Sequence, residues 1–326
     1  MVSKTRFFTI ALLLLFILFS SSLLIGRYNI FSRGFSFDED SLNVVYGIRL
    51  PRIIIAVLVG LSLGVSGAVM QSLFRNPLAG PSILGVSQGS AVGAAIAILL
   101  GLHYLYIHVL ATATGLLAVL FTWVLASSIR YGGSTLRLVL AGIAVSAFAS
   151  AIIGLIKYLA DPYDKLPQIV FWLMGSLAGT TWAQVTYALP LIIAGAAVVV
   201  VLRWTLNVLA LGDDEARALG VNVKSTRLAL IVASTLVTAT ATSVAGVISW
   251  IGLLSPHITR RLIGYDNRWV IPGSAIIGAL LLLVCDDIAR SIIVTELPLG
   301  VVTSFLGAPL FMAILRYAKP LGGERR

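Results

Sequence analysis

Long apolar runs alternate with short polar segments along almost the whole chain. Each run is about 20 residues long, the length at which an α-helix crosses the roughly 30 Å hydrocarbon core of a bilayer. The repetition predicts an all-α, polytopic membrane protein with about ten transmembrane helices. The predicted spans are 7–26, 52–73, 88–102, 107–128, 136–159, 184–203, 226–244, 247–262, 270–288 and 300–317.

Two segments depart from the simple pattern of complete spans. Residues 165–180 are apolar but short, and they predict an interfacial or half-inserted helix. The eighth span is interrupted by Gly252 and Pro256. Broken segments are tolerated at membrane depth only where protein or a water-filled cavity covers them.

A faint internal repeat has two open explanations. Gly67 precedes Pro77 by the same spacing with which Gly246 precedes Pro256. Transporters built from duplicated halves show broken helices at matching positions. Chance is the alternative, because glycine is abundant in this chain.

Composition and charge support the membrane reading. Hydrophobic residues make up 59% of the 326 positions and charged residues 11%, which excludes an ordinary soluble domain. The net charge of +10 could indicate a nucleic-acid partner, but the basic residues sit beside the spans, as the positive-inside rule describes. With the N-terminus inside, 16 of the 23 basic residues face the cytoplasm, which predicts that both termini are cytoplasmic. The run 7–25 is expected to be the first span, because it is too long for a signal peptide and no A-x-A site follows it.

Candidate chemistry is sparse. The phosphate-binding pattern G-x-x-x-x-G-K-[ST] is absent, so a separate chain must hydrolyse ATP if transport is ATP-driven. Cys285 is the single cysteine and excludes an intrachain disulfide. His103, His108 and His257 do not have metal-ligand spacing and are expected to make interfacial or simple polar contacts. The sequence therefore predicts no cofactor, no metal site and no enzymatic activity.

Two other classes of membrane protein fit the sequence less well. An ion-coupled secondary transporter typically buries acids or histidines at mid-membrane. Here the acids lie at span ends, including Asp286 and Asp287. An intramembrane enzyme would need a convergent catalytic set, and the sequence offers none.

The longest polar loop on the predicted cytoplasmic side contains a short helix signal. Asp213, Asp214 and Glu215 suit the positive end of a helix dipole, and Gly220 suits the helix end. The pattern predicts a surface helix of about two turns. It could be a solvated connector or a rigid element that docks into a partner subunit.

Nine short motifs follow one another from about residue 45 to the C-terminus. They are IRLPR (48–52), SGAVMQ (66–71), NPLA (76–79), LGVS (84–87), LALG (209–212), GL (252–253), PHI (256–258), ELPLGVVT (296–303) and LGAP (306–309). In this order they resemble the FecCD family of ABC importer permeases, which import iron(III)-siderophores, haem, vitamin B12 and related cargo. The resemblance implies a fold like the vitamin B12 importer permease, with residues 1–326 forming one transmembrane permease domain.

The resemblance also implies roles for matching residues. Segment 212–221 would be the cytoplasmic coupling helix that meets the ATPase, and its candidate residues are Gly212, Asp213, Asp214, Glu215, Ala216, Arg217, Ala218, Leu219 and Gly220. Arg49, Arg52 and Arg290 would pair with acids of a solute-binding protein; ordinary interfacial snorkelling is the alternative. The cytoplasmic gate would comprise Asn76, Leu78, Ser134 and Thr135, although Leu136 stands where relatives often carry a small polar residue.

The expected assembly is a homodimer in the cell (inner or plasma) membrane, with two ATPase subunits and an extracytoplasmic solute-binding protein. Transport would proceed by alternating access. The expected cargo is a bulky metal chelate, an iron(III)-siderophore, because a naked cation needs coordinating ligands that the spans lack. Haem and vitamin B12 fit the same physics, and molybdate fits it less well.

Overall fold

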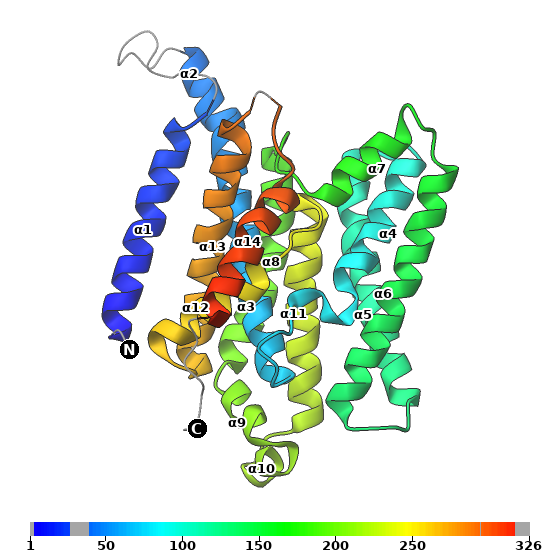
Figure 1. The fold of residues 1–326 in the computed structure, drawn as a ribbon, viewed down its shortest axis with the longest axis vertical. Coiled ribbons are helices and arrows are strands. Elements are labelled where there is room, and N and C mark those ends of the chain that lie inside the picture. The colour runs from blue at the N-terminus through cyan, green and yellow to red at the C-terminus, as the bar shows by residue number, and fades with distance from the viewer. Residues whose placement is uncertain (1–2, 27–38, 294, 317–326) are drawn as a thin grey trace.

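The computed structural model describes residues 3–26, 39–293 and 295–316. This part of the chain is helical throughout, with no strand, and its long helices run side by side (Figure 1). The helices are α1 (Lys4–Leu24), α2 (Glu39–Asn43), α3 (Leu50–Leu73), α4 (Val86–Leu99), α5 (Tyr104–Ser128), α6 (Ser134–Leu159), α7 (Lys165–Met174), α8 (Trp182–Leu202), α9 (Thr205–Leu211), α10 (Asp213–Ala218), α11 (Val223–Ala245), α12 (Ile251–Ile263), α13 (Asn267–Ser291) and α14 (Leu299–Arg316). A π-helical segment (Val44–Arg49) joins α2 to α3, and a 3-10 turn, η2 (Pro81–Leu84), precedes α4. The predicted all-α membrane fold is confirmed.

Each of the ten predicted spans coincides with a helix, but the helices differ in length. Among the described residues, seven helical stretches are long and apolar enough to cross a membrane. The shorter α4 and α12, with 14 and 13 residues, pack against longer neighbours: α4 against α5, and α12 against α3 and α13. The first residues of the two helices, Val86 and Ile251, are 1% and 2% exposed, as irregular backbone at membrane depth requires.

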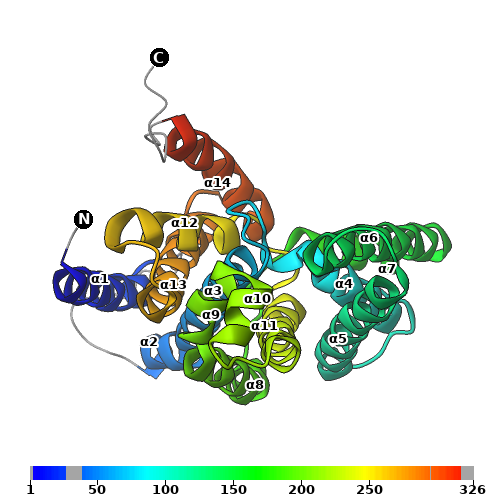
Figure 2. The same ribbon diagram turned by 90° about the horizontal axis from the view of Figure 1, so that it is seen from below.

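The centre of the bundle is formed by α3 and α11 (Figure 2). In the apolar stretches of these two helices, 83% and 78% of the residues are buried, compared with 17% in the peripheral α1. Helices α6 and α8 also keep much of their apolar surface exposed, as helices that face lipid or another subunit do. The buried positions of the central pair are occupied largely by small and aliphatic residues.

Glycines on α3 allow its backbone to touch two neighbouring helices. A Cβ added at Gly60 would lie 2.4 Å from the Gly278 carbonyl oxygen of α13. One added at Gly67 would lie 1.7 Å from the Gly252 carbonyl oxygen of α12. Such small-residue contacts let membrane helices approach closely. They pack α3, α12 and α13 tightly together.

The irregular stretch before α12 is longer than the apolar pattern suggests. The predicted eighth span begins at residue 247, whereas α12 begins at Ile251, because Trp250 adopts a left-handed backbone conformation with φ of 69°. The glycines of the possible repeat occupy unlike places: Gly67 lies inside α3, whereas Gly246 ends α11. At these positions the structure shows no matching break.

Candidate functional site

The three arginines expected to bind a partner lie together at the upper end of the bundle, where α1, α3 and α13 meet. Arg49, Arg52 and Arg290 are only 5%, 8% and 6% exposed. Their guanidinium groups bond within the chain: Arg49 donates from Nη1 to the Leu23 carbonyl oxygen (2.7 Å), and Arg290 donates to the Ser22 carbonyl oxygen (2.7 Å). The arginines therefore tie α1 to the helices behind it.

Acidic residues complete this outer cluster. The guanidinium of Arg52 donates to Asp286 through Nη2 (2.9 Å) and to Glu296 through Nη1 (2.8 Å). Arg290 forms an ion pair with Asp287, which also accepts a hydrogen bond from the Ser22 hydroxyl at 2.6 Å. Asp286 is fully buried, whereas the side chain of Glu296 is 30% exposed. Buried charges need such partners because desolvation is costly.

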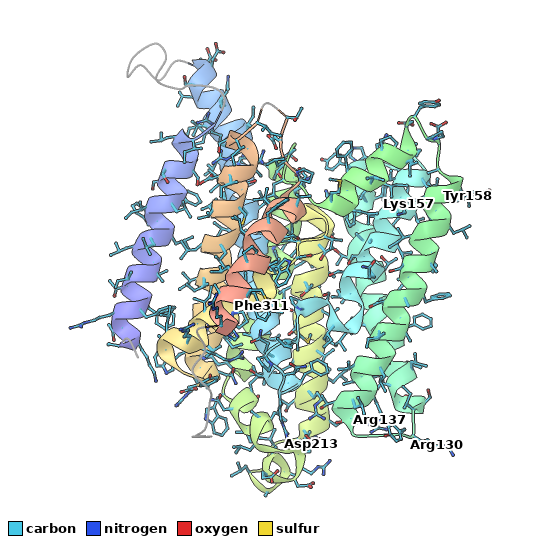
Figure 3. All side chains as sticks on the ribbon, in the orientation of Figure 1. Arg130, Arg137, Lys157, Tyr158, Asp213 and Phe311 are labelled. Atoms are coloured by element: carbon cyan, nitrogen blue, oxygen red, sulfur yellow. The ribbon has the colours of Figure 1, made fainter. Side chains whose placement is uncertain are left out.

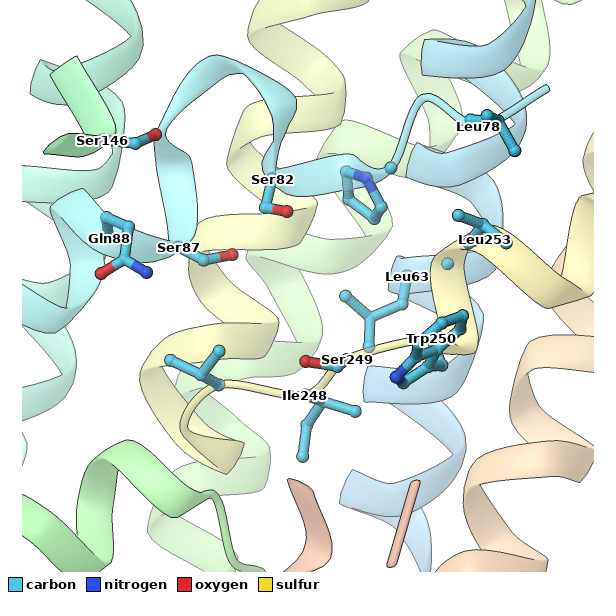
Figure 4. Close-up of a pocket in the computed structure, with 14 residues that line it drawn as sticks. Leu63, Leu78, Ser82, Ser87, Gln88, Ser146, Ile248, Ser249, Trp250 and Leu253 are labelled. Atoms are coloured by element: carbon cyan, nitrogen blue, oxygen red, sulfur yellow. The ribbon is translucent and has the colours of Figure 1, made fainter. Parts of the chain in front are cut away.

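A cavity of about 520 Å³ lies at mid-height between two irregular segments. One segment contains η2 and the start of α4, and the other is the stretch before α12. The 14 lining residues include no charged side chain. Its polar side-chain groups are the hydroxyls of Ser82, Ser87, Ser146 and Ser249, the amide of Gln88 and the indole N–H of Trp250 (Figure 4).

An aromatic residue closes one side of this central cavity. Trp250 packs against Phe311 of α14 with the two rings tilted by 51° and their centroids 5.8 Å apart. A Cβ added at Gly307 would lie 2.5 Å from the Trp250 Cβ, so α14 can approach only because it carries glycine there. Leu78, one of the predicted gate residues, also lines this cavity and is 55% exposed.

The two predicted gate segments occur in different parts of the chain. Asn76 and Leu78 belong to the loop after α3, where the Asn76 carboxamide accepts a hydrogen bond from the Leu78 N–H (2.9 Å). Ser134 and Thr135 begin α6. Among the described residues, no hydrogen bond joins one pair directly to the other. 

Asp213 links both gate segments to the predicted coupling helix. Asp213, the first residue of α10, accepts hydrogen bonds from Arg227 at 2.7 and 3.2 Å. Arg227 also donates to the Ser134 hydroxyl (3.2 Å), and Arg75 lies 3.9 Å from the Asp213 carboxylate. The hydrogen bonds from Arg227 lower the pKa of the Asp213 carboxyl, so it stays ionised at neutral pH.

The predicted surface helix is present as α10, at the lower end of the bundle (Figure 3, where Asp213 is labelled). Ala216 is buried against the bundle, whereas Leu219 is 60% exposed. Gly220 follows with φ of 79°, a left-handed conformation that suits glycine after a helix end. Acidic and apolar side chains are thus presented outward on a short, anchored helix.

The three histidines contact other parts of the bundle or cap a helix. His108 is buried, and its Nδ1 lies 2.7 Å from the Ser243 carbonyl oxygen. His103 caps the start of α5, and His257 packs against Phe311. No group of three or more metal-ligating side chains occurs among the described residues.

Comparison with known proteins connects this architecture to one family. A sequence model described as the FecCD transport family matches residues 9–317. The chain belongs to the FecCD transport family. The hemin transport system permease of Yersinia pestis is 40% identical over 296 residues, covering 88% of each chain. The molybdate import system permease of Haemophilus influenzae is 36% identical over 324 residues, covering 95% of each.

A solved structure supports the same assignment. An ABC transporter assigned to the metal-chelate type, in an inward-facing conformation, superposes with a TM-score of 0.90 at 34% identity. The match covers 97% of this chain and 100% of that one. The FecCD protein is therefore the multi-pass permease subunit of an ABC importer. It is not an enzyme, because ATP hydrolysis belongs to a separate subunit of such transporters.

Sequence reasoning missed two features of the FecCD permease. It placed Asp286 and Asp287 at a span end but did not pair them with arginines, since Arg52 and Asp286 are 234 positions apart. It also did not connect Asp213 with Arg227, although a basic residue fourteen positions after Asp213 was a usable signal. The roles of the coupling, docking and gate residues stay predictions.

Proposed function

We propose that two copies of this permease, with two ATPase subunits and an extracytoplasmic solute-binding protein, import an iron(III)-siderophore by alternating access. The observation that carries the proposal is the uncharged central cavity. Its serine hydroxyls and single amide can form hydrogen bonds with the rim of a chelate without holding it tightly. At about 520 Å³ in one copy, the cavity falls within the range of small-molecule sites, and a facing copy would enlarge it.

The same lining argues against smaller, more strongly charged cargo. A bare metal cation would need oxygen, nitrogen or sulfur ligands to replace its hydration shell. An oxyanion such as molybdate would be favoured by basic side chains, and no lining residue is basic. Haem and vitamin B12 also carry their metal ion inside an organic chelator, so they are the second candidates for the cargo. The hemin permease of Yersinia pestis supports this broader class.

Uptake into reconstituted vesicles tests the cargo. Vesicles that contain the permease and its ATPase, together with the binding protein, would be offered one radiolabelled compound at a time. The compounds are an iron(III)-siderophore complex, haem, vitamin B12, molybdate and free Fe²⁺. We expect ATP-dependent uptake of the siderophore complex. Uptake of free Fe²⁺ or molybdate alone would contradict the proposal, and uptake of haem or vitamin B12 alone would replace the named cargo.

We propose that both termini and α10 are cytoplasmic and that α10 contacts the ATPase. Supporting this, α1 begins and α14 runs toward the end of the bundle that carries α9 and α10 (Figure 1). The excess of basic residues in the loops at that end fits the positive-inside rule. A movement of α10 would reach the gate segments through Asp213, which contacts Arg227 and lies near Arg75.

We also propose that the outer arginine cluster receives the binding protein. Arg49, Arg52 and Arg290 lie at the end of the bundle opposite α10, as docking requires, but their burial means that a docking acid would compete with internal partners. The test measures binding-protein affinity and thermal stability on the same Arg→Gln variants. Because these arginines also stabilise the fold, the control is Asp286→Asn, which weakens the same cluster without removing an arginine. Docking that is weaker than in Asp286→Asn at an equal loss of stability supports the proposal; equally weakened docking contradicts it.

A further inference from the structure

A second cavity, of about 430 Å³, lies between the lower ends of α5, α6 and α11, beside α10. Four basic side chains and one acidic side chain line it. The basic residues are Arg137, Arg217, Lys224 and Arg227, and the acid is Asp213. The lining therefore carries an excess of positive charge, in contrast to the uncharged central cavity.

Two of these cations, Arg137 and Lys224, lack a carboxylate partner in the described chain. Arg227 is paired with Asp213 (2.7 Å), and Arg217 is paired with Asp214 (2.8 Å). Arg137 donates from Nη1 to the Ile129 carbonyl oxygen (3.1 Å), but its Nε is buried without a hydrogen-bond partner. Arg137 and Lys224 thus line the cavity with charges that no carboxylate of the described chain neutralises, and an anionic ligand there would gain charge-assisted contacts with both.

Backbone dipoles reinforce this preference for an anion. Helices α6 and α11, with 26 and 23 residues, both begin at the cavity, where Ser134 and Val223 line it. The N-terminus of a helix carries a partial positive charge and favours anions. The side chains and the two helix ends thus act in the same direction.

Most of the remaining lining is apolar. It includes Trp123, Ala126, Leu138, Leu228 and Ile231. One helical turn away, Leu120 of α5, three residues before Trp123, is 53% exposed, and Val232 of α11, four residues after Leu228, is 51% exposed. A ligand that fits both the basic and the apolar side chains has an anionic head and a hydrocarbon chain.

We propose that this cavity binds the phosphate headgroup of an anionic glycerophospholipid from the inner leaflet. Arg137 and Lys224 contact the phosphate, and an acyl chain lies along the exposed faces of α5 and α11. Basic pockets between transmembrane helices on the cytoplasmic side bind anionic headgroups in this manner. Arg137 and Arg130 lie at the lower ends of α6 and α5 (Figure 3), so the site is at the depth of the headgroups if α10 is cytoplasmic, as proposed above.

The site has a place in the transport cycle. Arg227 lines the cavity and also bonds to Asp213 of α10 and to Ser134 at the start of α6. A bound phosphate beside Arg227 would offset the mutual repulsion of the four cations that line the cavity, so Arg227 could stay between Asp213 and Ser134. The lipid would thereby brace the contact between the coupling helix and a gate segment.

Native mass spectrometry of the delipidated full-length chain tests the proposal. Phosphatidylglycerol, phosphatidylcholine and inorganic phosphate are titrated separately onto the wild type and two variants. The cavity variant is Arg137→Gln/Lys224→Gln. The matched control is Arg6→Gln/Arg130→Gln, which removes the same charge from two exposed positions outside the cavity.

Each basic residue near an anionic lipid contributes about fivefold in affinity, so we expect roughly 25-fold weaker phosphatidylglycerol binding by the cavity variant. The control should bind as the wild type does. Equal affinity for phosphatidylcholine, or an equal loss in the control, would overturn the proposal. Displacement of the lipid by inorganic phosphate at a similar concentration would show that a free phosphate is the ligand.

A second measurement does not depend on the variants folding. Photoactivatable phosphatidylglycerol is crosslinked to the wild-type chain in vesicles, and the labelled peptides are identified. We expect labels in 121–127 of α5 and 228–232 of α11. Labels confined to other helices would contradict the assigned site. Neither experiment involves transport, so failure here leaves the cargo proposal standing.

Discussion

The buried ion pair between Arg52 and Asp286 gives the sharpest prediction about stability. Asp286 is fully buried and accepts three hydrogen bonds from the Arg52 guanidinium, at 2.9, 3.1 and 3.1 Å. The Asp286→Asn variant leaves Arg52 buried with only Glu296 as a carboxylate partner. Breaking a buried pair by removing one partner costs about 3–5 kcal/mol. Arg52→Met should cost a similar amount, since the nearest remaining contact of Asp286 is Arg290 Nε at 3.8 Å.

The double variant Arg52→Met/Asp286→Leu tests whether the loss of stability comes from leaving one buried charge without its partner. Replacing both charges by apolar side chains of similar volume is often neutral, because neither charge of the pair is then left buried without its partner. We therefore expect the double variant to be more stable than either single variant. Glu296→Gln is the control: its side chain is 30% exposed, and its loss should cost less than about 1 kcal/mol.

Thermal unfolding of the purified full-length permease measures these differences. At about 2 °C per kcal/mol, each single variant should lower the apparent Tm by about 6–10 °C. The double variant should recover most of that loss. If the double variant instead loses the sum of the two single effects, the two residues act independently and the reasoning is refuted.

Three further predictions concern other parts of the permease. Cysteines at Glu215 or Ala218 should crosslink to the ATPase and resist an impermeant external reagent; external labelling would contradict the proposed orientation. Gly67→Ala should destabilise the bundle by about 1–3 kcal/mol, because its Cβ would lie 1.7 Å from a carbonyl oxygen. Gly154→Ala is the control: its Cβ has nothing within 4 Å, so it should be neutral or slightly stabilising. Equal urea unfolding midpoints for the two variants would refute the packing argument. Arg268 lowers the pKa of Asp266 to about 2, so the stability that this carboxylate adds is complete above about pH 4 and is lost as the pH falls toward 2. The Tm difference between the wild type and Asp266→Asn should therefore shrink from pH 4 to pH 2. A difference that stays constant over that range would contradict this.

The sequence predicted the helices well because each span carries its own signal. A run of about 20 apolar residues is a local property, and all ten predicted spans correspond to helices. The predictions failed where backbone geometry decides: Trp250, in a left-handed conformation, delays the start of α12 to Ile251. The π-helical extension before α3 was also missed, since its apolar run, residues 44–48, is too short to predict a span of its own.

Contacts between distant parts of the chain could not be predicted in the same way. The sequence placed Arg52 and Asp286 near the same face of the membrane, but only the packing of α3 against α13 pairs them. The positively charged cavity has the same origin, since Arg137 and Lys224 come from different helices. A single sequence offers no measure of which helix neighbours which.

The glycine contact between α3 and α13 also constrains how the permease is made. Gly278 is synthesised about 220 residues after Gly60, which takes about 10–40 s at typical translation rates. During that time α3 is already long and apolar enough to enter the membrane, but its glycine face has no partner. We therefore expect nascent chains that end before α13 to remain bound to the insertion machinery or to be degraded, because the centre of the bundle cannot close until its C-terminal third has emerged from the ribosome.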